Sequence, residues 1–249
     1  NLPMTALADI IVPVFNERDN LPQLLSCLQA LPDFSAFHLI FVDNASTDGS
    51  VEFIKSIPGA MLVCHASNLG YGASLRSGIA AAQTDTIVII DADCEYPPEC
   101  IPALLDALRA QDVVYASRLS GKLTAQQAGM SRLKWWGNRI ISAAYNLLFK
   151  QKITDLYTGC KALKLECLQD INLSRNGFEQ VLEMAAKLSA HGYHIHEVPV
   201  DFLPRNRGKS KMSHISETVK YFYWLLFYRI QLLPMLVPRP QEDVRDKRH

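Results

Sequence analysis

The chain has 249 residues, of which 49% are hydrophobic and 20% are charged, and this balance excludes a disordered, collagen-like or disulfide-scaffold protein. Its length suits one large α/β domain. Because 25 lysines and arginines balance 25 aspartates and glutamates, no net positive field favours nucleic acid, and any anion site must be a local cluster of cations.

Short apolar runs alternate with helical segments through the first half of the chain. The runs are rich in β-branched residues and too short for helices, which is typical of buried parallel strands. They lie at residues 9–15, 38–43, 61–64, 86–91 and 113–116. Between them, apolar residues recur at helical spacing, and we expect helices at 21–31, 48–56, 72–82 and 98–110. Right-handed crossovers then predict an open, mostly parallel α/β sheet flanked by helices.

After residue 117 the pattern becomes mixed. We expect helices at 131–150 and 178–191 and an edge or mixed strand at 194–202, before a basic loop, 205–211, that holds four cations in seven positions. We divide the chain into a domain at 1–214, an amphipathic helical segment at 215–237 and a polar tail at 238–249.

The predicted C-terminal helix, 216–233, carries apolar side chains at three- and four-residue steps. They are Val219, Phe222, Tyr223, Leu226, Phe227 and Ile230. The density of aromatic residues favours a helix that lies in a membrane interface. Packing within the chain or in a dimer, and a membrane span, are the alternatives.

Carboxylates follow three of the predicted strands. In an open α/β sheet, ligands bind beyond the carboxyl ends of the strands. Glu17, Asp43, Asp91 and Asp93 would repel one another there unless a cation or a hydrogen-bonding ligand joins them. Asp91-Ala-Asp93 can present oxygens to one Mg²⁺ or Mn²⁺ and leave positions for a diphosphate. The same spacing is also found at helix N-caps, but its place after the fourth strand favours the metal.

Nine segments, in chain order, resemble the inverting, nucleotide-sugar-dependent glycosyltransferases of family 2, and in particular the polyprenyl (dolichyl) phosphate mannosyl- and glucosyltransferase branch. They are residues 11–17, 42–49, 68–78, 91–93, 136–139, 154–161, 177–179, 197–200 and 205–211. The resemblance implies a GT-A-like fold, a nucleotide diphosphate sugar as donor, a polyprenyl phosphate as acceptor, and Mg²⁺ or Mn²⁺ as cofactor.

The resemblance also implies roles for single residues. Asp91 and Asp93 would bind the metal, with Asp93 needed for turnover. The donor would contact Pro13, Phe15, Glu17, Asp43, Asn68, Gly70, Arg76, Asp91 and Lys211. Small residues between the cations of 205–211 let the main chain approach an anion, so this loop is a candidate phosphate clamp. We expect the acceptor phosphate and the donor diphosphate to be held together by Arg118, Arg139, Arg205 and Lys209.

The chain departs from the family pattern at two positions near the predicted site. Cys94-Glu95 replaces the common Leu-Gln, so Glu95 either adds a carboxylate near the metal or faces solvent. Gly159-Cys160-Lys161 replaces Gly-Phe-Arg, which keeps a cation and loses an aromatic ring. No histidine or carboxylate stands out as a general base, which favours a phosphate acceptor over a hydroxyl acceptor. A hydroxyl acceptor and a non-catalytic nucleotide-sugar-binding domain are the alternatives.

The six cysteines form no CxxC pair and lie mostly in apolar surroundings, as expected of reduced thiols in the cytoplasm. Together with the absence of a signal-like start, this predicts a peripheral protein at the cytoplasmic face of a membrane. It could form a homo-oligomer.

Overall fold

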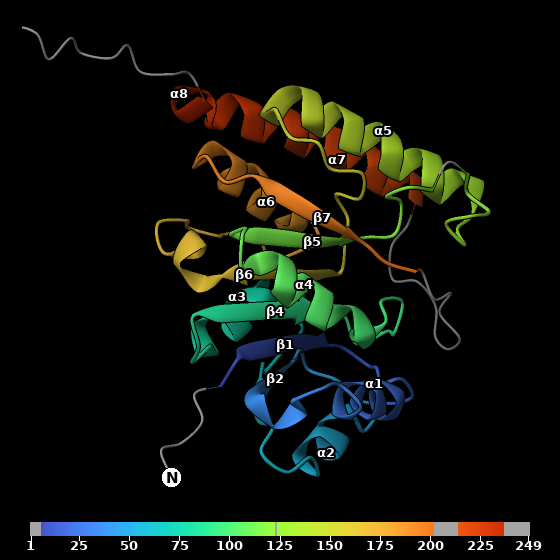
Figure 1. Cartoon of the computed structure of the whole chain (residues 1–249), viewed down its shortest axis with the longest axis vertical. Coiled ribbons are helices and arrows are strands. Elements are labelled where there is room, and N and C mark those ends of the chain that lie inside the picture. The colour runs from blue at the N-terminus through green and yellow to red at the C-terminus, as the bar shows by residue number, and fades with distance from the viewer. Residues whose placement is uncertain (1–5, 123, 202–213, 237–249) are drawn as a thin grey trace, which may run out of the picture.

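A seven-stranded sheet forms the centre of the computed structural model, which describes residues 6–122, 124–201 and 214–236 (Figure 1). The strands are β1 (Ala8–Val14), β2 (Phe37–Asp43), β3 (Met61–Cys64), β4 (Thr86–Ile90), β5 (Val113–Ser117), β6 (Cys160–Lys164) and β7 (Ile195–Pro199). Their order across the sheet is β3-β2-β1-β4-β6-β5-β7. Among these strands, β6 alone runs antiparallel to its neighbours, β4 and β5. The predicted open, mostly parallel α/β sheet is confirmed.

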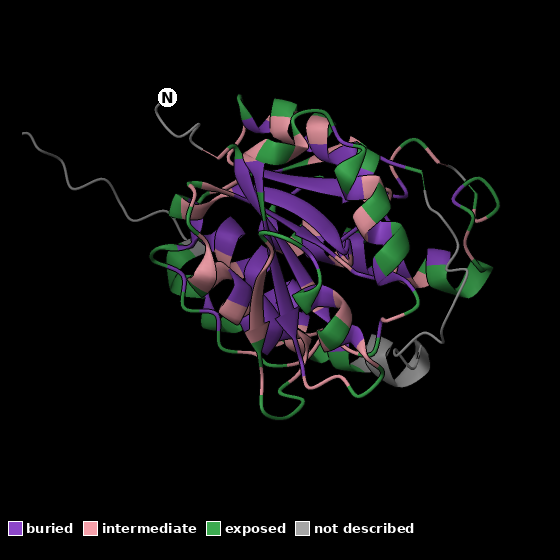
Figure 2. Ribbon diagram, turned by 90° about the horizontal axis from the view of Figure 1, so that it is seen from below, coloured by how far each residue is buried: buried purple, intermediate pink, exposed green. Residues whose placement is uncertain are grey.

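Helices cover both faces of the sheet. They are α1 (Leu21–Gln29), α2 (Ser50–Lys55), α3 (Tyr71–Ala81), α4 (Ile101–Leu108), α5 (Arg132–Phe149), α6 (Gln180–Ala190), α7 (His214–Gln231) and α8 (Leu233–Leu236). Short 3₁₀ turns lie at Phe34–Ala36, Pro98–Cys100 and Leu165–Leu168. One apolar core joins the sheet to α1, α2 and α4, and the other joins it to α3, α5, α6 and α7. Strands β1, β2, β4, β5 and β6 are almost entirely buried between these layers, whereas the edge strands β3 and β7 are partly exposed (Figure 2).

Strand β6 is the one described strand that the sequence pattern did not predict. Its sequence, Cys-Lys-Ala-Leu-Lys, is interrupted by two lysines and does not form the apolar run that identified the other strands. It inserts between β4 and β5, with Lys161 opposite both Ile89 and Tyr115. This pairing brings the turn before β6 to the carboxyl end of β4, where the Asp91 amide N–H donates to the Gly159 carbonyl over 3.1 Å.

Helix α7 packs along α5 and α6 (Figure 1). It buries Tyr221, Leu225 and Tyr228, so one side of the helix belongs to the core. Most of the apolar stripe predicted for this segment lies on the other side of the helix. Phe222, Tyr223, Leu226 and Ile230 are exposed, Phe227 is half-buried, and the side chain of Val219 is outside the description. No helix in the described ranges is long and apolar enough to cross a bilayer.

Candidate functional site

The loops after β1 and β2 lie side by side because the two strands pair in register, with Val14 opposite Asp43. Side chains of one loop bind main-chain groups of the other. The Asn16 amide donates to Ser46 Oγ over 2.9 Å, and the Glu17 amide donates to Ser50 Oγ over 3.1 Å. The two predicted nucleotide-binding segments therefore form one surface at the carboxyl edge of the sheet.

Asp43 and Glu17 are both buried on this surface. Asn20 donates to one Glu17 oxygen over 2.6 Å, and the Ser46 amide donates to Asp43 Oδ2 over 3.1 Å. The other Asp43 oxygen, Oδ1, is buried and has no hydrogen-bond partner among the described residues. An unpaired buried carboxylate oxygen is costly, which makes Asp43 a candidate acceptor for a hydroxyl or N–H group of a ligand. Pro13 and Phe15 are half-buried beside it.

A second group of contacts holds the loop that contains Asn68 and Gly70. Asn44 donates to Asn68 Oδ1 over 2.7 Å, and the same oxygen accepts from the Gly70 amide over 3.0 Å. Gly70 has φ +97°, and a Cβ there would meet the Asn176 carbonyl oxygen at 2.3 Å, so only glycine fits. Arg76 donates to the Arg175 carbonyl and to the Asn176 side chain. This arginine thus holds the 175–176 loop against α3, and its predicted contact with a diphosphate stays a prediction.

Asp91 and Asp93 follow β4, as predicted. Tyr71 Oη donates to Asp91 Oδ1 over 2.8 Å, and the Glu95 amide donates to Asp93 Oδ1 over 3.0 Å. Burial and the negative charge of Asp93 raise the pKa of Asp91 to about 7. The hydrogen bond from Tyr71 and the positive charge of Lys161 lower it and offset part of this rise. A nearby cation would relieve this repulsion.

The carboxylate pair fits part of a divalent-cation site. Within the described ranges, no three His, Cys, Asp or Glu side chains gather closely enough to hold a metal. Asp91 and Asp93 would therefore supply two protein oxygens, and the remaining ligands would have to come from substrate or water, which is usual for Mg²⁺ beside a phosphate.

Gly159 packs directly against Asp91. A Cβ on Gly159 would lie 2.1 Å from Asp91 Oδ2. The side chain of Lys161, two residues on, is fully buried, and its Nζ lies 5.0 Å from the centre of the Tyr115 ring without a hydrogen-bond partner among the described residues. Burial lowers the pKa of Lys161 to about 8, although the negative charge of Asp91 acts in the opposite direction and raises it. The cation that replaces the family's arginine thus lies close enough to interact with Asp91.

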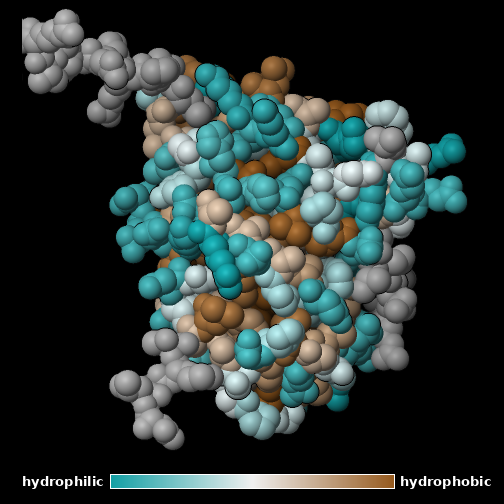
Figure 3. All heavy atoms as spheres, in the orientation of Figure 1, coloured by the Kyte–Doolittle hydropathy of each residue, from teal (hydrophilic) through white to brown (hydrophobic). Residues whose placement is uncertain are grey.

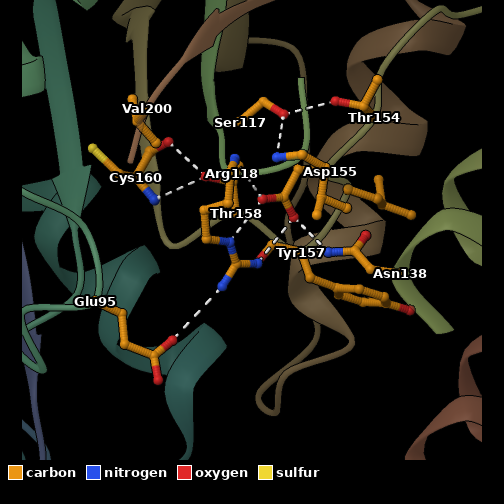
Figure 4. A network of polar contacts seen from close by, with 12 residues as sticks. Glu95, Ser117, Arg118, Asn138, Thr154, Asp155, Tyr157, Thr158, Cys160 and Val200 are labelled. Carbon is orange, nitrogen blue, oxygen red and sulfur yellow. Dashed lines mark hydrogen bonds and ion pairs between the residues drawn. The ribbon is translucent and has the colours of Figure 1, made fainter. Parts of the chain in front are cut away.

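Arg118 forms a buried ion pair at the end of β5 (Figure 4). Its Nε lies 2.7 Å from Asp155 Oδ2, and its Nη2 lies 2.9 Å from Asp155 Oδ1. Asn138 donates to Asp155 Oδ1 over 2.6 Å, and the guanidinium stacks 4.8 Å over the Tyr96 ring. These contacts fix the plane of the guanidinium at the same edge of the sheet as the two aspartates.

Glu197 on β7 binds the segment that contains Asp155 and so helps to position the ion pair. It accepts the amide N–H groups of Thr154 and Asp155 over 2.8 and 2.9 Å, and Thr154 Oγ1 donates to its other oxygen over 2.7 Å. Asp155, Asn138 and Glu197 lie in segments that carried the family resemblance, but the sequence assigned them no role. No sequence periodicity connects residues 138, 155 and 197, because tertiary packing alone brings them together.

Arg139 differs from Arg118 in its surroundings. Arg139 is exposed on α5 and stacks 4.8 Å over the Trp135 ring, whereas its neighbour Asn138 turns inward to Asp155. Arg205, Lys209 and Lys211, with the rest of the predicted phosphate clamp, lie outside the described residues, as does the predicted tail at 238–249. The roles given to these cations stay predictions.

Comparison with known proteins identifies the chain as a glycosyltransferase. The chain belongs to the glycosyl transferase family 2, which matches residues 9–171. It is 30% identical over 82% of its length to the undecaprenyl-phosphate mannosyltransferase of Micrococcus luteus, covering 86% of that protein. It is 28% identical to the dolichol-phosphate mannosyltransferase of Mycosarcoma maydis, over 84% of this chain and 74% of that one. The family and the enzyme class predicted from the sequence are confirmed.

The fold is shared with the glucosyl-3-phosphoglycerate synthase of Mycobacterium tuberculosis. A crystal structure of that enzyme in complex with Mn²⁺, uridine diphosphate and glucosyl-3-phosphoglycerate superposes with a TM-score of 0.64. The match covers 93% of this chain and 81% of the other at 19% identity. At this identity the likeness concerns the GT-A-like fold alone.

Proposed function

We propose that the protein transfers a sugar, with inversion, from a nucleotide diphosphate sugar to a polyprenyl phosphate, with Mg²⁺ or Mn²⁺ as cofactor. The observation that carries the proposal is the arrangement of Asp93, Glu95 and Arg118. A carboxylate pair suited to a cation and an oriented guanidinium suited to a phosphate lie on either side of one glutamate. The named relatives from Micrococcus luteus and Mycosarcoma maydis support the polyprenyl phosphate as acceptor.

The donor would lie along the carboxyl edge of β1, β2 and β4. Buried Asp43, with its unpaired oxygen, and Glu17 would contact the nucleoside, and the loop of Asn68 and Gly70 would lie beside the diphosphate. A divalent cation at Asp91 and Asp93 would neutralise charge on the leaving diphosphate. The protein's own contribution is to hold these groups rigid before the donor arrives.

The acceptor would approach from the side of Arg118. A phosphate monoester already carries an anionic oxygen near neutral pH, so its attack on the sugar carbon needs no general base. The approach of two anions needs cations, which Arg118, Arg139 and the loop with Arg205, Lys209 and Lys211 would supply.

The lipid part of the acceptor implies a membrane surface. Helices α5 and α7 pack side by side, and each exposes large apolar side chains. Hydrophobic atoms reach the surface at the top of Figure 3, the part of the view where these helices lie. On α5 these are Leu133, Trp136, Ile140 and Leu147, and on α7 they are Phe222, Tyr223, Leu226 and Ile230. Arg132, Lys134 and Arg139 are exposed on α5. Apolar side chains flanked by cations suit an anionic bilayer, and we place this surface at the cytoplasmic face of the membrane.

One experiment tests donor and acceptor together. The protein is incubated with a panel of nucleotide sugars, Mg²⁺ or Mn²⁺ and a short polyprenyl phosphate, and the lipid product is identified by its mass. We expect a polyprenyl-phosphate sugar that chelation of the metal prevents and that the free polyprenol cannot replace. Transfer to the free alcohol at a comparable rate would contradict the proposal and favour a hydroxyl acceptor.

The membrane surface has a separate test. Replacing Trp136 and Leu226 together by serine should weaken co-sedimentation with anionic vesicles, whereas Leu7→Ser, at an exposed leucine before β1, should not. Unchanged partitioning of the double variant, with an intact far-UV spectrum, would show that this surface does not bind lipid.

A further inference from the structure

Glu95 lies between the carboxylate pair and Arg118. Its amide N–H donates to Asp93 Oδ1, and its carboxylate oxygen Oε2 lies 3.6 Å from Arg118 Nη1. The Glu95 side chain is 19% exposed, so it is within reach of a ligand from solution. Figure 4 shows it pointing at the guanidinium from the side away from Asp155.

The ion pair with Asp155 decides which edge of Arg118 a ligand can use. Nε and Nη2 point to Asp155, and Nη2 also faces the Tyr157 carbonyl at 3.4 Å. Nη1 is the nitrogen turned toward Glu95. We therefore expect a phosphate oxygen that binds Arg118 without breaking the buried pair to approach Nη1, beside the Glu95 carboxylate.

We propose that the Glu95 carboxylate occupies the anion position on Arg118 and is displaced by the phosphate of the acceptor. The proposal rests on the proposed function, because that function places the acceptor phosphate at Arg118. An internal carboxylate competes with a bound anion, and the apparent affinity falls by the fraction of molecules in which the position is already taken. The carboxylate also repels an anion that stays near it.

The expected effect is modest because Glu95 Oε2 and Arg118 Nη1 lie 3.6 Å apart, too far for a hydrogen bond. Removing the Glu95 charge should therefore lower the Kd of a phosphate ligand roughly two- to fivefold. The effect should shrink at high ionic strength, because salt screens charges that solvent can reach.

The test compares by calorimetry the Kd of two phosphate ligands, a short polyprenyl phosphate and inorganic phosphate, for the wild type, Glu95→Gln and Asp106→Asn. Mn²⁺ is titrated separately into the same three proteins. Asp106 is the matched control, because it faces Arg109 at the same 3.6 Å separation on the exposed surface of α4. We expect Glu95→Gln to bind both ligands more tightly at low salt and Asp106→Asn to bind them as the wild type does. Thermal melts of both variants check that they fold.

Three results would overturn the inference. One is an unchanged or weaker affinity for both ligands in Glu95→Gln. Another is a loss of Mn²⁺ affinity in Glu95→Gln with no change for phosphate, which would make Glu95 a metal ligand. The third is equal tightening by Asp106→Asn, which would reduce the effect to net charge. If Glu95→Gln binds inorganic phosphate more tightly and no variant binds the lipid, the anion position stands and the proposed acceptor is wrong.

Discussion

Replacing Asp155 by asparagine should destabilise the protein strongly. The Asp155 side chain is fully buried, and it accepts from the Arg118 amide, from Arg118 Nε and Nη2, and from Asn138 Nδ2. An asparagine offers one acceptor oxygen, and its NH₂ group would face these donors. Breaking a buried ion pair by removing one partner costs about 3–5 kcal/mol, because the other charge stays buried.

For a chain of this size, that cost corresponds to a fall in Tm of about 6–20 °C. Urea unfolding at pH 7 measures the free energy directly, provided that the slope with denaturant is unchanged. The control is Asp106→Asn, which removes a carboxylate from an exposed ion pair and should cost less than about 0.5 kcal/mol. A loss below about 1 kcal/mol for Asp155→Asn would refute the reasoning.

The ion pair also predicts a pH dependence. Burial alone would raise the pKa of Asp155, but the charge of Arg118 and the hydrogen bonds from Arg118 and Asn138 hold it below its usual value of 3.8. Its stabilising contribution is therefore present above pH 3.8 and is lost as pH falls through the folded-state pKa. The stability difference between the wild type and Asp155→Asn should shrink on acidification through that range. A difference that stays constant down to pH 2 would contradict this explanation.

Three further predictions concern the ligand sites. Because the pKa of Asp91 is raised to about 7, ionisation of this carboxyl should lower the stability of the metal-free protein as pH rises from about 4 to 7. Asp91→Asn should therefore have a higher Tm than the wild type at pH 8 and the same Tm at pH 3. A lower Tm for the variant at pH 8 would contradict this. Gly159→Ala should weaken Mn²⁺ binding by at least about tenfold in a titration, because its Cβ would displace Asp91, whereas Gly137→Ala meets no atom within 4 Å and should bind normally. Asp43→Asn should weaken nucleoside diphosphate binding by about tenfold in calorimetry with little change in Tm, and an unchanged Kd would remove Asp43 from the donor site.

Much of the fold could be predicted because its information is local. Five parallel strands appear as short apolar runs, and the helices between them appear as apolar residues at helical spacing, since each element must bury one face or both. The carboxyl edge follows from the strand direction, so Glu17, Asp43, Asp91 and Asp93 could be assigned to one edge without coordinates. The apolar stripe of α7 was also visible, although the sequence did not show that its opposite side packs on α5 and α6.

The contacts between segments far apart in the chain were decided by the tertiary structure alone. Strand β6 carries two lysines, and its position between β4 and β5 is determined by pairing with strands that lie more than 40 residues earlier in the chain. Arg118 and Asn138 meet Asp155 across 37 and 17 residues, and this pairing turns one edge of the guanidinium toward Glu95. Sequence shows which side chains carry charge, but the direction of a hydrogen bond depends on backbone positions that long-range packing alone sets.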